Sequence, residues 1–76
     1  MLTAEQIKAA RALLSWGQSD LAEASGLSLP TIKRVEAARG TIRSTPATIA
    51  AIRKALEAAG IDFIQNGVVG VTRRHL

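Results

Sequence analysis

Gly26 is the position that most constrains the fold, because it separates two short segments that both have helical apolar spacing. Residues 18–24 form the first helix, with Ala22 turned inward, and Gly26 ends it. Ser28 can cap the next helix by accepting the backbone N–H of Thr31. Helices joined by so short a turn need small residues where they cross, and Ala22 lies one turn before the glycine. The sequence therefore predicts two short helices that cross at a steep angle, with Ala22 and Gly26 in structural roles.

Two further helices are expected on either side of this pair. A capping box of Thr3 and Gln6 starts the first, which should end near residue 15. Its apolar stripe consists of Ile7, Ala10, Leu13 and Leu14. The Thr45-Pro46 pair starts the second, which ends at Gly60. Its inward stripe consists of Ile49, Ile52 and Leu56. Residues 39–44 have no apolar period and are expected to form a loop.

After Gly60 the pattern indicates a β-hairpin with a two-residue turn at Asn66-Gly67. Such a turn pairs Ile64 with Val69 and places apolar residues on both faces of the ribbon. An isolated two-stranded ribbon is marginal in water, so the hairpin must pack on something. It either covers its own helices or pairs through its free edge with a second chain, and the sequence leaves both alternatives open. The residues expected to form a dimer interface in the second case are Phe63, Ile64, Val69 and Val71.

The turn rule also sets the register of the neighbouring pair, which is Phe63 opposite Gly70. Together these elements predict a mainly α fold of four helices with a C-terminal β-hairpin. We divide the chain into a helical domain, residues 1–60, and a hairpin with a basic tail, residues 61–76.

Composition excludes most enzyme chemistry. The chain has no cysteine, and its single histidine, His75, lies one residue from the end. No Ser/His/Asp set, carboxylate pair or metal-ligand spacing is present. We therefore expect a protein that is not an enzyme and that has no cofactor, no bound metal and no small-molecule substrate. No apolar stretch is long enough for a membrane span, and Glu5 argues against a signal peptide, so a cytoplasmic location is expected.

The positive charge is concentrated in one short segment. The formal net charge is +4 and the sequence pI is about 10.8, which favours polyanionic partners. Residues 1–32 are slightly acidic, whereas residues 33–43 carry four basic side chains against one acidic side chain. A charged segment of this kind is ordinarily just a solvated face. The segment overlaps the second helix of the predicted pair and the loop after it, which makes it a candidate for binding nucleic acid.

The residues of the helix pair carry a resemblance to a known family. Residues 18–28, QSDLAEASGLS, and residues 31–36, TIKRVE, resemble the helix-turn-helix of Cro/cI-type (XRE family) bacterial and phage regulators. The resemblance extends over residues 3 to 59 and implies a lambda-repressor-like fold. It further implies a regulator of transcription that binds double-stranded DNA as a homodimer, in the cytoplasm and associated with the nucleoid.

The resemblance places residues 28–34 in the major groove of DNA. Arg34 is the first candidate for base contact, since a guanidinium can donate to both acceptors of a guanine. The base-reading candidates are Arg34, Lys33, Thr31, Ser28 and Leu29. Leu29 and Pro30 have no hydrogen-bonding side chain where the family often has polar readers such as glutamine. Sequence readout is therefore expected to depend on Arg34 and on DNA shape.

Phosphate contacts are expected from Gln18, Arg39, Arg43 and Arg11. Gln18 opens a helix, so its N–H and its amide can meet an anion at the positive end of the helix dipole. Arg39 and Arg43 lie in the loop after the reading helix. The family pairs an arginine of the first helix with the glutamate after the reading helix, and Arg11 and Glu36 occupy those positions. Such a pair would fix the reading helix while Arg11 also faces the DNA.

Two alternatives to a regulator stay open. The chain could be the antitoxin of a toxin-antitoxin pair, with the hairpin or the last helix contacting a toxin or other regulatory protein. It could also be a protein-interaction module that keeps this fold without binding DNA. A DNA-binding protein and a pure interaction module differ in one testable respect. In the first, the basic segment at residues 33–43 contributes to DNA affinity, and in the second it does not.

Overall fold

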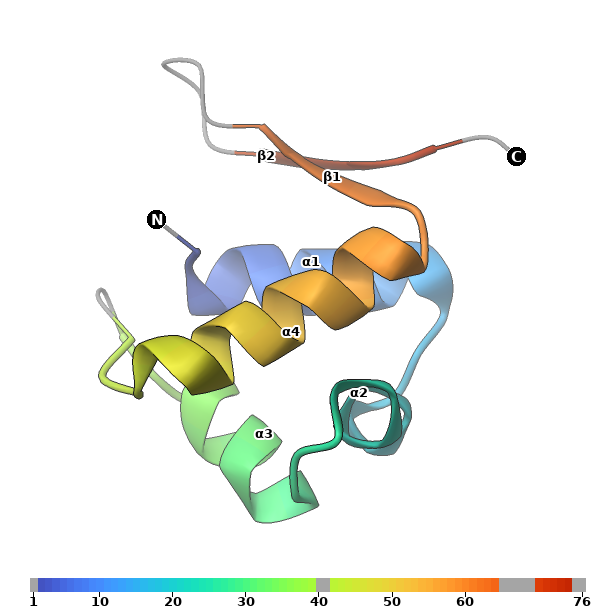
Figure 1. Cartoon of the computed structure of the whole chain (residues 1–76). Helices are drawn as coiled ribbons and strands as arrows, with labels where there is room; N and C mark the ends of the chain where they lie inside the picture. The colour runs from blue at the N-terminus through green and yellow to red at the C-terminus, as the bar shows by residue number, and fades with distance from the viewer. Residues whose placement is uncertain (1, 40–41, 65–69, 75–76) are drawn as a thin grey trace.

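A computed structural model describes residues 2–39, 42–64 and 70–74 (Figure 1). The chain is mainly helical and ends in a small antiparallel hairpin, as the sequence predicts. The elements in chain order are α1 (Ala4–Leu14), α2 (Gln18–Ser25), α3 (Leu29–Glu36), α4 (Pro46–Ala58), β1 (Ile61–Ile64) and β2 (Gly70–Arg73).

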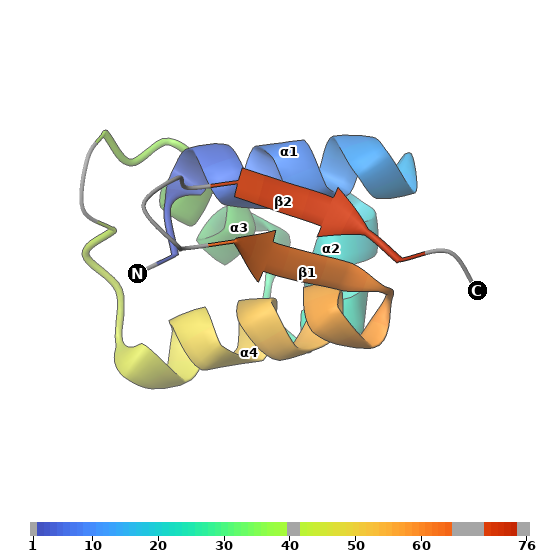
Figure 2. The same ribbon diagram turned by 90° about the horizontal axis from the view of Figure 1, so that it is seen from above.

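The elements lie in three layers. Helices α1 and α4 form the middle layer, with the hairpin on one side and with α2 and α3 on the other (Figure 1). The view from above shows the hairpin lying over α1 and α4, with α2 and α3 behind them (Figure 2). The hairpin and the α2–α3 pair are therefore on opposite sides of the molecule.

Helix starts are fixed by local capping bonds. The Gln6 N–H donates to Thr3 Oγ1 at 3.1 Å, and the Thr3 N–H donates to Gln6 Oε1 at 2.9 Å, which completes the predicted capping box. The Thr31 N–H donates to Ser28 Oγ at 3.3 Å at the start of α3. Thr45 caps α4 in the same way. These bonds satisfy backbone donors that have no partner inside the helix.

Helix ends use the left-handed backbone region. Gly26 ends α2 with φ of 72°, and Gly60 follows α4 with φ of 105°. Both are glycines because a side chain is disfavoured there. Ser15 adopts φ of 57° at the end of α1 and is the non-glycine residue with positive φ in the described part of the chain. The predicted helix ends are confirmed at Gly26 and Gly60.

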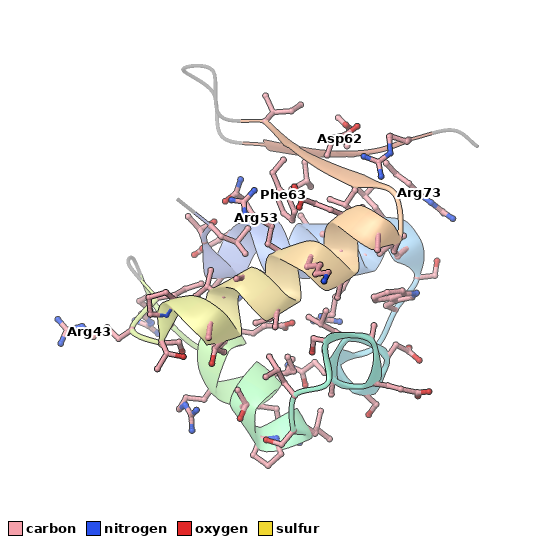
Figure 3. All side chains as sticks on the ribbon, in the orientation of Figure 1. Arg43, Arg53, Asp62, Phe63 and Arg73 are labelled. Carbon is pink, nitrogen blue, oxygen red and sulfur yellow. The ribbon has the colours of Figure 1, made fainter. Side chains whose placement is uncertain are left out.

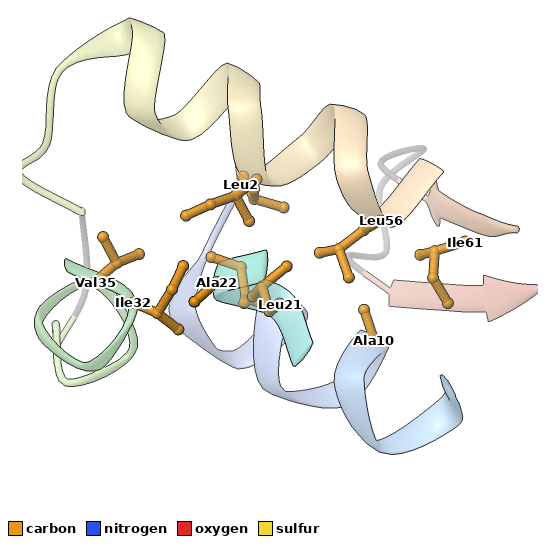
Figure 4. Close-up of a cluster of buried hydrophobic side chains, with 10 residues drawn as sticks. Leu2, Ala10, Leu21, Ala22, Ile32, Val35, Leu56 and Ile61 are labelled. Atoms are coloured by element: carbon orange, nitrogen blue, oxygen red, sulfur yellow. The ribbon is translucent and has the colours of Figure 1, made fainter. Parts of the chain in front are cut away.

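One hydrophobic core joins all four helices to the first strand (Figure 4). Its largest fully buried side chains are Ile7, Leu21, Ile32, Ile52, Leu56, Ile61 and Val35. Leu13 was expected in this core, and that prediction is wrong, since the side chain is 42% exposed. Adjacent helical residues point about 100° apart, so only Leu14 of the two packs against the core.

The hairpin register differs from the prediction by one residue. Phe63 pairs with Val71, and Ile64 pairs with Gly70. This register places Val71 on the same face as Phe63, and both side chains pack against the core. Burial decides the register, because a shift of one residue would move Val71 to the outer face. The hairpin thus covers its own helices, while the predicted turn at Asn66-Gly67 lies outside the described residues.

Candidate nucleic-acid interface

Helix α3 has one face in the core and one in solvent. Ile32 and Val35 are fully buried and anchor the helix. The exposed residues recur at helical spacing along the opposite face and are Pro30, Lys33, Arg34 and the C-cap Ala37. The structure therefore places Lys33 and Arg34, two of the predicted base-reading residues, side by side on the outer face of α3.

The other three base-reading candidates are placed differently. Leu29 is half-buried and packs against the core, because it lies one turn before the buried Ile32. The prediction that Leu29 faces a base is not supported by this position. The hydroxyls of Ser28 and Thr31 lie 2.8 Å apart and bond to each other at the start of α3. These two hydroxyls therefore serve first in capping the helix.

A buried ion pair connects α1 to the end of α3. Arg11 Nε donates to Glu36 Oε2, and Arg11 Nη2 donates to Glu36 Oε1, both at 2.7 Å. Glu36 is only 4% exposed. The hydrogen bond to Glu36 raises the pKa of Arg11, burial opposes that rise, and the charge of Glu36 adds to it. The predicted pairing of Arg11 with Glu36 is confirmed.

The remaining nitrogen of Arg11 is also engaged inside the protein. Arg11 Nη1 donates to the Trp16 carbonyl oxygen at 3.0 Å, which ties the ion pair to the segment before α2. The side chain of Arg11 is 17% exposed. All three of its nitrogens thus have partners within the chain, so its geometry favours the structural role over the predicted phosphate contact.

Gln18 contacts the same carboxylate. Its Nε2 donates to Glu36 Oε1 at 3.2 Å, so side chains of α1 and α2 both bind the last residue of α3. The Gln18 amide is predicted to meet a phosphate, whereas the structure places it on Glu36, a contact that was not predicted. No signal in the sequence indicates this contact, because it depends on how α1, α2 and α3 pack against one another.

Three arginines surround a hollow of about 340 Å³ beside the exposed face of α3. The hollow lies between the end of α3 and the start of α4, and its lining residues are Arg34, Val35, Ala38, Arg39, Ile42, Arg43 and Ser44. Arg43 extends outward from the loop before α4 (Figure 3). Among the described residues the ion pairs are Arg11–Glu36, Arg53–Glu57 and Arg74–Asp62. The three arginines of the hollow take part in none of these pairs and are exposed to solvent.

Three of the predicted dimerisation residues, Phe63, Ile64 and Val71, lie on the hairpin, across the molecule from α3. Phe63 and Val71 face the helices, and the guanidinium carbon of Arg53 lies 5.0 Å from the centre of the Phe63 ring. Ile64 is 41% exposed on the outer face of the hairpin. Val69 lies outside the described residues. Phe63 and Val71 thus hold the hairpin against the helices of its own chain. Of the predicted dimerisation residues that the structure describes, Ile64 is the one whose side chain is exposed.

The basic residues at the end of the hairpin, Arg73 and Arg74, are also held by local contacts. Arg73 Nη1 donates to the Leu13 carbonyl at 3.2 Å. Arg74 pairs with Asp62 at 2.5 Å and donates to the Glu57 carbonyl at 2.7 Å. Figure 3 shows Arg73 on the hairpin, across the molecule from α3. These arginines fasten the hairpin and do not extend the positive surface of α3.

In comparisons with known proteins, no family model and no curated protein sequence matches the chain. Across residues 2–39, 42–64 and 70–74, no three His, Cys, Asp or Glu side chains are grouped so that they could hold a metal ion. No described helix has the length and apolar character needed to cross a membrane. The candidate interface is therefore defined by its own residues, namely Lys33, Arg34, Arg39 and Arg43 on a frame held by Glu36.

Proposed function

We propose that this protein is a small DNA-binding regulator of transcription that inserts the outer face of α3 into the major groove. The observation that carries the proposal is a group of exposed basic side chains, with Lys33 and Arg34 on the outer face of α3 and with Arg34, Arg39 and Arg43 around one hollow. A helix fits the major groove, and a cationic surface of this kind is the electrostatic signature of nucleic-acid binding. The order of the four helices supports a relation to the Cro/cI-type helix-turn-helix proteins.

In this proposal each part of the interface has its own task. Arg34 reads a guanine, and Lys33 contacts a base or a phosphate. Arg39 and Arg43 neutralise phosphates beside the groove and so fix the register of α3. Glu36 holds the end of α3 to α1 and α2, so the reading helix meets the groove at a fixed angle.

The protein is proposed to bind two half-sites as a homodimer, since one such module buries too little surface for high specificity. Both copies of α3 must then point to the same side of the dimer. The hairpin lies opposite α3, so two chains joined through the outer faces of their hairpins would direct their α3 helices away from each other (Figure 1). We therefore propose that the dimer forms through a lateral side of the molecule, which leaves both α3 helices facing one duplex.

The test is selection of bound sequences from a random duplex pool, followed by titration of the selected duplex in low salt. The double variant Arg34→Ala, Arg39→Ala should lose most of its affinity, because it removes a base contact and a phosphate contact. Arg73→Ala is the matched control, since it removes an exposed positive charge from the opposite side of the molecule. A palindrome with half-sites about one helical turn apart supports the dimer. Unchanged affinity of the double variant at low salt would instead favour a protein-interaction module.

A further inference from the structure

The hollow between α3 and α4 has two kinds of wall. Its rim carries the exposed side chains of Arg34, Arg39 and Arg43. Its deeper wall is apolar, because Val35 is fully buried and Ala38 and Ile42 are half-buried. The hollow therefore has positive charge at its opening and hydrocarbon beneath it.

The three arginines at the rim attract an anionic ligand. Arginine matches phosphate in particular, because its planar guanidinium donates two parallel hydrogen bonds to phosphate oxygens. The hydroxyl of Ser44, which is half-buried at the same wall, supplies a further donor. Neither carboxylate nor carboxamide side chains are found among the lining residues. The described lining residues thus offer no carboxylate to a divalent cation or to a basic peptide.

The apolar wall selects among anions. An inorganic phosphate would use the rim and leave the surfaces of Ala38 and Ile42 in contact with water. A ligand with an anionic end and a carbon-rich body uses both walls, which is the usual arrangement of a ligand site. A pentose phosphate has this character, with its phosphate at one end and the carbons of its ring at the other.

We propose that the hollow is a preformed subsite for one sugar-phosphate unit. The arginine rim holds the phosphate, and the sugar carbons lie against Ala38, Ile42 and Val35. This inference rests on the proposed function in one respect, because the backbone of a bound duplex is one source of that unit. A free pentose phosphate or nucleoside monophosphate is the other source. The two compete for the same hollow, so a free sugar phosphate weakens the binding of DNA.

The test follows the methyl resonances of Val35, Ala38 and Ile42 by NMR during titration with ribose 5-phosphate at constant ionic strength. Inorganic phosphate and ribose are titrated in parallel. Ribose 5-phosphate should bind about tenfold more tightly than inorganic phosphate, which corresponds to the burial of roughly two methylene-sized groups. Ribose alone should leave the three resonances unmoved, because it has no group for the arginine rim.

The double variant Arg39→Gln, Arg43→Gln should abolish the shifts caused by ribose 5-phosphate. Both side chains are exposed, so their replacement should not disturb the fold. Unchanged methyl resonances outside the hollow would verify this. Arg73→Gln is the matched control on the hairpin and should leave the titration unchanged. A parallel titration of bound duplex with ribose 5-phosphate should release the DNA in the wild-type protein.

The outcomes separate this inference from the proposed function. If duplex binds but ribose 5-phosphate does not move the three methyl groups, the subsite is refuted and the DNA-binding function stands. If ribose 5-phosphate and inorganic phosphate bind equally, the apolar wall plays no part and the inference is again refuted. If ribose 5-phosphate binds as expected and no duplex does, the subsite stands and the DNA-binding function fails.

Discussion

Arg11 and Glu36 form a two-point ion pair that fastens the end of α3 to the middle layer of the molecule. Gln18 donates to the same carboxylate, so the last residue of α3 is bound from two other helices. The exposed Lys33 and Arg34 lie within one turn of this anchor. The orientation of the outer face of α3 is thus determined by a buried charge and not by apolar packing alone.

Replacing Arg11 with methionine should strongly destabilise the fold. Glu36 would remain buried without its ionic partner, which costs about 3–5 kcal/mol of unfolding free energy. Urea denaturation followed by circular dichroism measures the loss. Glu57→Gln is the control, because it breaks an exposed pair with Arg53 and should cost less than about 0.5 kcal/mol. A loss below about 1 kcal/mol in Arg11→Met would show that the pair does not anchor α3.

The contribution of this pair should not vary with pH through the neutral and mildly alkaline range. The pKa of Arg11 is raised in the folded state, so the stability that it contributes is complete below its unfolded pKa. That stability is lost only as the pH rises through the still higher folded pKa. Titration of Arg11 should therefore cause no change in the unfolding free energy of the wild-type protein between about pH 6 and about pH 9. A steady decline across this interval would contradict the assigned charge state.

Gly26→Ala should lower the unfolding free energy by about 1 kcal/mol. An added Cβ meets no atom within 4 Å, so the cost arises from the backbone conformation with φ of 72° and not from a clash. Asparagine tolerates this region better than alanine, and Gly26→Asn should recover part of the loss. Gly70→Ala is the control in a strand, where the nearest atom to the new Cβ lies 4.0 Å away, and it should be neutral or slightly stabilising. Equal losses in Gly26→Ala and Gly26→Asn would point to a different cause.

Ile61→Ala should cost about 2–5 kcal/mol, because the side chain is fully buried at the point where the hairpin meets the helical core. Ile64→Ala, on the exposed face of the same strand, should have little effect. Thermal unfolding of both variants measures the difference. If Ile61→Ala were as stable as the wild-type protein, packing of the hairpin would contribute little to the stability of the helices. Residues 1–60 would then form an independent domain, as the division of the sequence at residue 60 predicts.

The salt dependence of DNA binding counts the phosphate contacts. Three contacts per chain predict a slope of roughly −2 to −3 for log affinity against log salt. Arg43→Gln should reduce the magnitude of the slope by about 0.9 and weaken binding to all sequences alike. Arg34→Gln should instead weaken the selected sequence more than a random duplex. Fluorescence anisotropy at several salt concentrations measures both, and an unchanged slope in Arg43→Gln would remove that residue from the phosphate contacts.

Local signals predicted the helices well, because the determinants of a helix start lie within a few residues. The threonine and serine caps at Thr3, Ser28 and Thr45 all bond as expected. The hairpin register could not be obtained in this way. The turn rule pairs Phe63 with Gly70, whereas the structure pairs Phe63 with Val71 so that both pack on the helices. That choice depends on where the helices lie, which the sequence of the hairpin does not contain.

Part of the candidate interface could also be predicted from local sequence signals. Lys33 and Arg34 lie on the outer face because Ile32 and Val35 occupy the inner one, which helical spacing indicates directly. The contact of Gln18 with Glu36 and the hollow beside Arg34 require the placement of separate elements in space. The pairing of Arg11 with Glu36 was predicted only from the family resemblance, since nothing in the spacing of these residues brings them together.

Because the hairpin lies across the molecule from α3, its outer face can be labelled or attached to a surface without covering α3. A fluorescent dye coupled to the thiol of a Thr72→Cys variant, at an exposed position of β2, would be separated from α3 by the layer of α1 and α4. Immobilisation through the same position would present α3 outward to passing duplexes, with the whole thickness of the chain between the label and the groove.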